Sequence, residues 1–212
     1  MIKVEFYHDA VCGWCYIMSP RLRKIITKFN VDVVHRSFVL QRSKEEMIER
    51  FSSMENAKHE ILSHWEACKT SADDPSTINI EGMKAAKFDY PSGYQAALFT
   101  KSAEILWGQE AHWDLFDAIQ KEHLSESRNI ADINVLLAIA HEIGLDGNAL
   151  QELVVDENIG RLVKQDNARA MTFGIKTIPT IVIDGRQVIS QAMTLGQLER
   201  LFSTISASVV SE

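Results

Sequence analysis

The apolar positions at the start of the chain change from a period of two to a helical period and back. Residues 2 to 7, IKVEFY, alternate and carry β-branched or aromatic side chains, which predicts a strand. Residues 12 to 29 then place Ile17, Leu22 and Ile25 on one helical face. Residues 31 to 40, VDVVHRSFVL, are largely apolar, which predicts a parallel strand buried on both faces. These three segments predict a βαβ unit.

A long helical segment and a second group of strands follow. From about residue 43 to residue 173 the apolar positions keep a helical period, with breaks at SADDPSTIN, DYPSG, LSESRN and GLDGN. TIPTIVIDG and RQVIS then predict two strands joined by a tight turn at Asp184 and Gly185. Residues 194 to 205, TLGQLERLFSTI, predict a closing helix with Thr194 as its N-cap. We expect the aromatic residues of the helical segment to pack in a core rather than line a groove: Trp65, Trp107, Trp113 and Phe116.

The charge and hydropathy of the chain exclude several classes of partner. The net charge is −7, whereas nucleic acids and anionic membrane surfaces select clusters of Lys and Arg. The basic stretch from Arg21 to Lys24 is interpreted as a solvated helix face. No apolar run approaches the roughly 18 residues of a membrane span, and residues 1 to 9 do not resemble a secretory signal. We therefore expect a cytoplasmic protein with no nucleic-acid or membrane partner.

The stretch DAVCGWCYI contains the strongest candidate for chemistry. Structural disulfides are rare in a reducing cytosol, so three cysteines do not indicate a disulfide framework. Cys12 stands at the predicted start of a helix, where free backbone N–H groups and the helix dipole favour negative charge on its sulfur. Cys15 lies one turn later, where it can close or open a disulfide with Cys12. The pair predicts thiol–disulfide exchange.

Two other interpretations of the cysteine pair are a structural metal site and a pair of buried, inert thiols. A structural zinc site usually has four Cys or His ligands, but Cys68 is isolated and the seven histidines form no metal-binding motif. We therefore predict no metal. The pair could also be buried and inert, which the strand-to-helix junction makes the weaker alternative.

A proline far along the chain supports the redox interpretation. KTIPTIVID begins a strand with Ile178 and Pro179, a position where no ladder N–H is lost. A cis bond between Ile178 and Pro179 would turn the backbone of residue 178 toward Cys12 and offer polar groups to an extended client. With a CxxC motif upstream, we expect the cis form.

These motifs together resemble the thioredoxin superfamily: a strand, CxxC, a helix carrying Pro20, and a later apolar-Pro strand with a hairpin and a closing helix. The helical insertion looks like the DsbA branch. Within it, DAVCGWCYI, HRSFVL, NVLLAIAHEIGLD, DNARAMTFGIKTIPTIVIDG and VISQA resemble the FrnE-like cytoplasmic oxidoreductases. The resemblance implies an α/β thioredoxin fold, residues 1–42 and 174–212, with an inserted all-helical domain, residues 43–173.

The resemblance also implies a site. It identifies Cys12 and Cys15 as the catalytic thiols, which exchange disulfides with protein or small-molecule thiols. The client would contact Gly13, Trp14, Ile178 and Pro179, and Pro20 would kink the helix to position the turn. The dithiol itself is the only redox centre implied, with glutathione as a candidate co-substrate. The sequence leaves the oligomeric state open between monomer and homodimer.

The sequence departs from this group at two points. Gly13 stands where a proline is common, and ALFTKSAEIL, residues 97 to 106, lacks an Asp-His feature often seen there. A reducing cytosol favours a reductase, isomerase or peroxide-responsive role over bulk oxidation. Cys68 is expected to be half-buried and inert.

Two alternative functions stay open. Relatives resembling hydroxychromene-carboxylate isomerases and kappa-class glutathione transferases use the same architecture as glutathione-dependent enzymes, but usually lack the second cysteine. A binding module or chaperone with a redox-sensitive cysteine latch is the other alternative.

Overall fold

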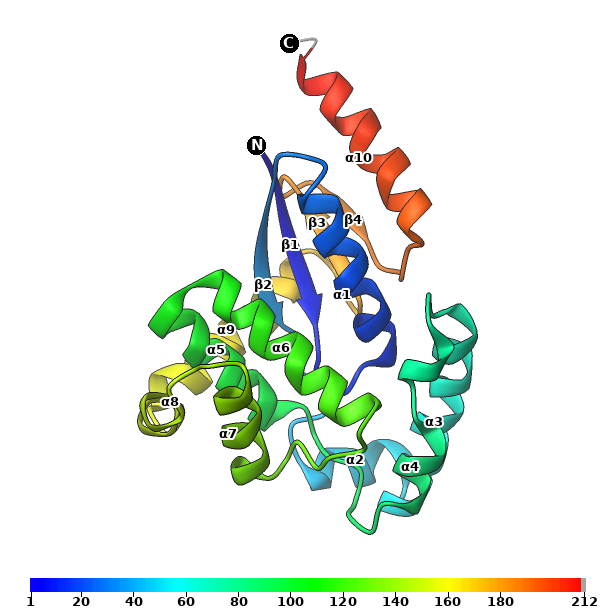
Figure 1. Ribbon diagram of the computed structural model, residues 1–212, viewed down its shortest axis with the longest axis vertical. Helices are drawn as coiled ribbons and strands as arrows, with labels where there is room; N and C mark the ends of the chain where they lie inside the picture. Colours follow the sequence, from blue (N-terminus) through cyan, green and yellow to red (C-terminus); the bar gives the residue numbers. More distant parts are fainter. Residues whose placement is uncertain (211–212) are drawn as a thin grey trace.

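Four strands form one mixed sheet in the computed structural model, which describes residues 1–210 (Figure 1). The strands are β1 (Ile2–His8), β2 (Val31–Ser37), β3 (Thr180–Ile183) and β4 (Gln187–Ile189), in the order β2-β1-β3-β4. Strand β1 pairs in parallel with β2 and antiparallel with β3, and β3 pairs antiparallel with β4. The central position of β1 places its C-terminal end, where the cysteine turn begins, in the middle of the sheet.

The helices fall into two groups (Figure 1). Helix α1 (Gly13–Ile26) connects β1 to β2 and contacts α10 (Leu195–Val210), which closes the fold after β4. All the other helices lie between β2 and β3: α2 (Lys44–Phe51), α3 (Met54–Ser71), the 3-10 helix η1 (Pro75–Thr77), α4 (Ile80–Ala85), α5 (Tyr94–Trp107), α6 (Gln109–Leu124), α7 (Ile133–Glu142), α8 (Gly147–Val154) and α9 (Glu157–Thr172). This is a thioredoxin fold with a helical insertion, as expected. The division into two separate domains stays a prediction, and its residues 211 and 212 lie outside the described range.

Local sequence signals account for many of the element ends. Side chains of Ser43, Ser53 and Asp156 accept hydrogen bonds from backbone N–H groups in the first turns of α2, α3 and α9. The β3–β4 hairpin turns at Asp184 and Gly185, with φ angles of 48° and 65°. Such angles suit the two-residue turn predicted from the Asp-Gly pair.

Strand β2 differs from the prediction. It ends at Ser37 rather than at residue 40, and its positions alternate between half-buried and buried. The expectation of burial on both faces was wrong because one face carries Asp32, Val34 and Arg36, which are only half-buried.

Side chains of the insertion satisfy the outer edge of β2. The backbone N–H of His35 donates to Gln109 Oε1 at 2.8 Å, and the N–H of Ser37 donates to Asp166 Oδ2 at 3.2 Å. Asn167 donates from Nδ2 to the Ser37 carbonyl at 3.2 Å. Helices α6 and α9 are thereby fixed to the sheet through its backbone.

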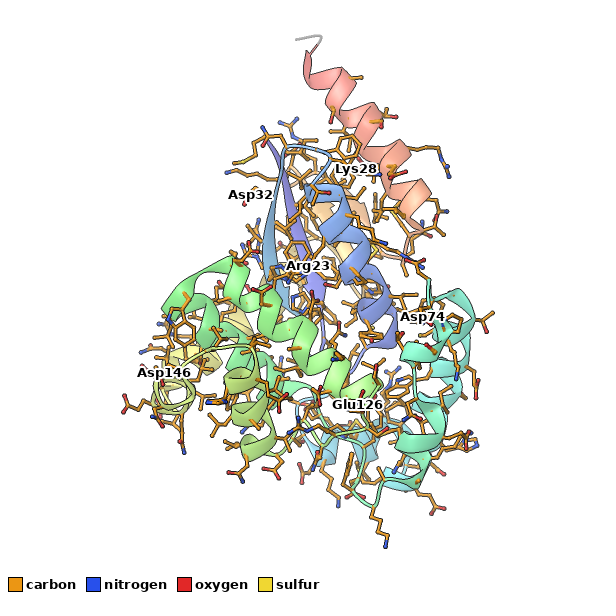
Figure 2. All side chains as sticks on the ribbon, viewed as in Figure 1. Arg23, Lys28, Asp32, Asp74, Glu126 and Asp146 are labelled. Atoms are coloured by element: carbon orange, nitrogen blue, oxygen red, sulfur yellow. The ribbon has the colours of Figure 1, made fainter. Side chains whose placement is uncertain are left out.

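The basic stretch on α1 is not a solvated face. Arg21 is 3% exposed and donates to Asp73, to the Ser71 carbonyl and to the Met193 carbonyl. Arg23, labelled in Figure 2, pairs with Asp117 at 2.6 Å and with other acids of α6. The sequence interpretation was wrong because the acidic partners come from the insertion, far along the chain.

Both groups of helices share one apolar core, in which Phe6 of β1 contacts Phe116 of α6. The predicted core position is confirmed for Trp65, Trp113 and Phe116, whereas Trp107 is 41% exposed. Within residues 1–210, no helix combines the length and the hydropathy that a membrane crossing requires.

Candidate active site

Cys12 and Cys15 lie at the junction of β1 and α1 in different environments. Cys12 is the N-cap of α1, and its Sγ accepts a hydrogen bond from the Cys15 N–H at 3.4 Å. Its side chain is 8% exposed, whereas Cys15 is completely buried. Burial, together with the hydrogen bond and charge of Cys12, raises the pKa of Cys15 well above its ordinary value. Both cysteines are free thiols.

The Ile178–Pro179 bond is cis, as expected. The Cys12 thiol faces the Ile178 carbonyl oxygen, with 3.9 Å between Sγ and O. Ile178 is half-buried and Pro179 is buried. Two segments separated by more than 160 residues therefore meet at the sulfur of Cys12.

A cavity of about 700 Å³ opens beside Cys12, between the sheet and the insertion. Gly13, Trp14 and Ile178 line it, but Pro179 does not. Most of its other walls come from the insertion and from the loops that flank it, including Phe38, Met47, Phe51, Trp65 and Cys68. Its acidic, basic and histidine lining residues are Arg50, Glu60, His64 and Lys176. The cavity combines an apolar wall with a few polar groups, as ligand sites commonly do.

Cys68 explains why a glycine stands between the cysteines. A Cβ on Gly13 would lie 3.0 Å from Cys68 Sγ and 3.3 Å from its Cβ, tighter than ordinary contacts. A proline at this position would meet the same atoms. Cys68 is 1% exposed rather than half-buried, and burial, together with the charge of Cys12, raises its pKa to about 12. A pKa this high makes Cys68 a poor nucleophile.

Asp9 anchors the turn that precedes Cys12. Its carboxylate accepts hydrogen bonds from the Leu40 N–H at 2.8 Å and the Val11 N–H at 3.3 Å. A Cβ on Gly93 would lie 1.7 Å from its Oδ1, so only glycine fits there. Burial raises the pKa of Asp9 to about 6, against the backbone hydrogen bonds that lower it.

Three polar residues of the insertion form a hydrogen-bond network that supports the backbone of the cysteine turn, and sequence reasoning missed all of them. Gln120 donates from Nε2 to the Cys12 carbonyl at 3.1 Å, and Tyr90 donates to the Val11 carbonyl at 3.1 Å. His123 Nε2 lies 3.1 Å from the Tyr90 hydroxyl. Gln120 and His123 are polar residues at buried positions of α6, which is a weak sequence signal, whereas Tyr90 lies in a break between helices, where periodicity gives no signal.

The fold also collects three histidines that form no motif in the sequence. His8, His35 and His112 are buried, and one ring nitrogen from each lies within 4.8 Å of the others. Burial lowers the pKa of all three. They come from β1, β2 and α6, so no local spacing could have indicated them.

Comparison with known proteins shows that one protein-family profile matches nearly the whole chain. The sequence profile of the DSBA-like thioredoxin domain matches residues 3–202. The ClpXP adapter protein SpxH of Bacillus subtilis is 23% identical over 188 residues, which cover 88% of this chain and 59% of that relative. The chain thus spans about three fifths of the length of this relative.

Solved structures share the fold. The cytosolic disulfide reductase DsbM from Pseudomonas aeruginosa has a TM-score of 0.77 and 20% identity, covering 99% of this chain and 100% of that chain. DsbM has also been solved with GSH. A 2-hydroxychromene-2-carboxylate isomerase has a TM-score of 0.67 and 12% identity, covering 99% of this chain and 98% of that chain.

Proposed function

Since the chain belongs to the DSBA-like thioredoxin domain family, we propose that it is a thiol–disulfide oxidoreductase in which Cys12 attacks and Cys15 resolves. The Cys12 thiolate attacks a client disulfide, forms a mixed disulfide and releases one client thiolate. Cys15 then loses its proton and attacks Cys12 Sγ, which forms the Cys12–Cys15 disulfide and releases the second client thiolate. The reverse sequence oxidises a client dithiol.

The asymmetry of the two cysteines carries this proposal. Cys12 lines the cavity and is the N-cap of α1, where its Sγ accepts a hydrogen bond from the Cys15 N–H. Cys15 is fully buried, and its raised pKa keeps it protonated until a mixed disulfide forms on Cys12. An attacking sulfur that faces a cavity and a resolving sulfur that is fully buried suit two-step exchange.

We propose that an extended client lies along Ile178 and Trp14. The Ile178 carbonyl is 3.9 Å from Cys12 Sγ, and Trp14 offers a half-buried apolar surface beside it. Pro179 acts through the shape of the backbone and not by contact, because it does not line the cavity.

We propose glutathione as the small-molecule co-substrate because its charged groups match charged side chains of the cavity. It carries two carboxylates and one ammonium group, and the cavity walls include Arg50, Lys176 and Glu60. Replacing Arg50 or Lys176 by glutamine is expected to raise KM for glutathione disulfide about tenfold with little change in kcat. Lys164→Gln, on the exposed face of α9 and away from the cavity, is the control. Equal KM values for Arg50→Gln, Lys176→Gln and Lys164→Gln would refute the glutathione proposal.

We further propose a reducing role in the cytoplasm. The structural similarity to DsbM, a cytosolic disulfide reductase, supports this proposal. The isomerase alternative rests on fold similarity alone, and the retention of both Cys12 and Cys15 favours exchange over it.

Trapping of the mixed disulfide tests the proposed function. Cys15→Ser leaves Cys12 able to attack but removes the thiol that releases the product. In cell lysate, this variant should accumulate protein or glutathione adducts on Cys12, visible on non-reducing gels and by mass spectrometry. Cys12→Ser is the matched control, and Cys68→Ser in both backgrounds excludes adducts on the third thiol. A Cys12 that alkylates readily yet carries no adduct would refute exchange as the main activity.

A further inference from the structure

The buried histidine cluster lies outside the thiol chemistry. His8 ends β1, His35 lies in β2 and His112 lies in the first turn of α6. Their exposed fractions are 3%, 0% and 0%. His8 Nε2 lies 3.0 Å from His35 Nδ1, and the rings of His35 and His112 stack with centroids 4.9 Å apart.

The tautomer of His112 leaves a lone pair without a partner. His112 Nδ1 lies 2.8 Å from Glu104 Oε2, and the Lys101 ammonium pairs with the same carboxylate oxygen at 2.7 Å. A carboxylate only accepts, so Nδ1 carries the proton and Nε2 carries the lone pair. Among the described residues, His112 Nε2 and His35 Nε2 are both buried without a hydrogen-bond partner. Buried polar atoms in a native protein are rarely left without a partner.

The hydrogen bond between His112 and Glu104 is of a kind found at metal sites. Metal-binding histidines usually donate their other N–H to a carboxylate, which fixes the ring and its tautomer, as Glu104 does here. Lys101 would oppose a cation, but its ammonium is paired with Glu104 and with Asp166, each at 2.7 Å. The charges next to the cluster are therefore already compensated.

We propose that His8, His35 and His112 bind one divalent transition-metal ion, with zinc as the best match to three imidazoles. Zinc–nitrogen bonds of about 2.0–2.1 Å place tetrahedral donors about 3.4 Å apart. His8 Nε2 and His35 Nδ1 are 3.0 Å apart, so they have to separate slightly, and side-chain rotation has to bring in the third nitrogen from within 4.8 Å. When the metal ion binds, the proton shared by His8 and His35 moves to another ring nitrogen or is released to solvent.

Three protein ligands leave one coordination position of the ion open. A cavity of about 10 Å³, the size of one water, borders His8, Asp9 and Ser37, although neither His35 nor His112 lines it. Ser37 Oγ is a further buried atom without a hydrogen-bond partner among the described residues. The ion would join β1, β2 and α6, and so connect the sheet to the insertion. The site is independent of the thiols.

Metal binding to a thiol-free protein tests the proposal. Cys12→Ser/Cys15→Ser/Cys68→Ser removes every thiolate ligand, and Co²⁺ or Zn²⁺ is then added to the folded chain. We expect one ion per chain, visible d–d bands of Co²⁺ with nitrogen ligands, and a rise in Tm of about 5–10 °C at saturating Zn²⁺. In the same background His112→Gln should lose at least about tenfold in affinity, whereas His141→Gln, on the exposed end of α7, should bind normally.

Three results would overturn the metal site. The first is a folded thiol-free protein without Co²⁺ bands, and the second is a Tm that Zn²⁺ does not raise. The third is equal affinity of His112→Gln and His141→Gln, which would mean binding at surface histidines. If circular dichroism shows that His112→Gln does not fold, His8→Gln and His35→Gln are compared with His141→Gln in its place.

Discussion

Asp9 gives the clearest test of how burial acts at this site. Its carboxyl is 4% exposed, and burial raises its pKa from an ordinary 3.8 to about 6 even though backbone N–H groups donate to it. The folded chain therefore holds the Asp9 proton more tightly than the unfolded chain. By linkage, its contribution to the free energy of unfolding is complete below about pH 4 and is lost as the pH rises through about 6.

The size of this loss in the free energy of unfolding follows from the pKa shift of Asp9. Roughly two pKa units at 1.36 kcal/mol each correspond to about 3 kcal/mol between pH 4 and pH 7. Asp9→Asn removes the titration, while its amide oxygen keeps one backbone hydrogen bond. The free energy of unfolding of the variant, relative to the unsubstituted chain, should therefore rise by about 3 kcal/mol over this range.

Urea unfolding followed by tryptophan fluorescence at intervals from pH 4 to pH 8 measures this difference. Glu126→Gln, which removes one exposed carboxylate, controls for the loss of a negative charge. A difference between Asp9→Asn and the unsubstituted chain that stays constant with pH would refute the reasoning. A difference that falls with pH would mean that the backbone hydrogen bonds outweigh burial.

Two further predictions concern packing and buried charge. Gly13→Ala should destabilise the chain by about 1–3 kcal/mol, because the new Cβ meets Cys68 Sγ at 3.0 Å. Adding Cys68→Ala should recover at least about 0.5 kcal/mol beyond additivity in a double-mutant cycle, and a purely additive cycle would contradict the contact. Glu104→Gln should cost about 3 kcal/mol in urea unfolding at pH 7, since it leaves buried Lys101 and His112 with a weaker partner. Glu81→Gln, in an exposed pair, should leave the unfolding midpoint nearly unchanged, and equal effects of the two substitutions would argue against the buried network.

The parts of the structure that could be predicted depend on signals carried by neighbouring residues. The period of two identified β1, the Asp184–Gly185 pair identified the hairpin, and the CxxC motif marked the start of α1. The cis bond before Pro179 was predicted from the CxxC motif and the strand start together. The helical segment, expected over 43–173, is observed as the helices from α2 to α9, Lys44 to Thr172, because its apolar positions keep a helical period between the breaks.

The parts that could not be predicted depend on pairs of residues far apart in the chain. Arg21 is buried because Asp73 comes from beyond the end of α3, and a local charge pattern cannot show that. His35 and His112 are 77 positions apart, so their stacking depends on how α6 crosses β2. The support of the cysteine turn by Gln120 is of the same kind. The FrnE-like subtype stays a prediction.

The side chains along β2 have a consequence for how the chain behaves at high concentration. An outer strand with free N–H and C=O groups is a template for pairing with a strand of another molecule. On β2, Gln109, Asp166 and Asn167 already occupy these groups at His35 and Ser37. The opposite edge is β4, which is only three residues long. Neither edge offers a long row of backbone groups for joining copies of the sheet into fibres, so association of folded molecules has to use side-chain surfaces.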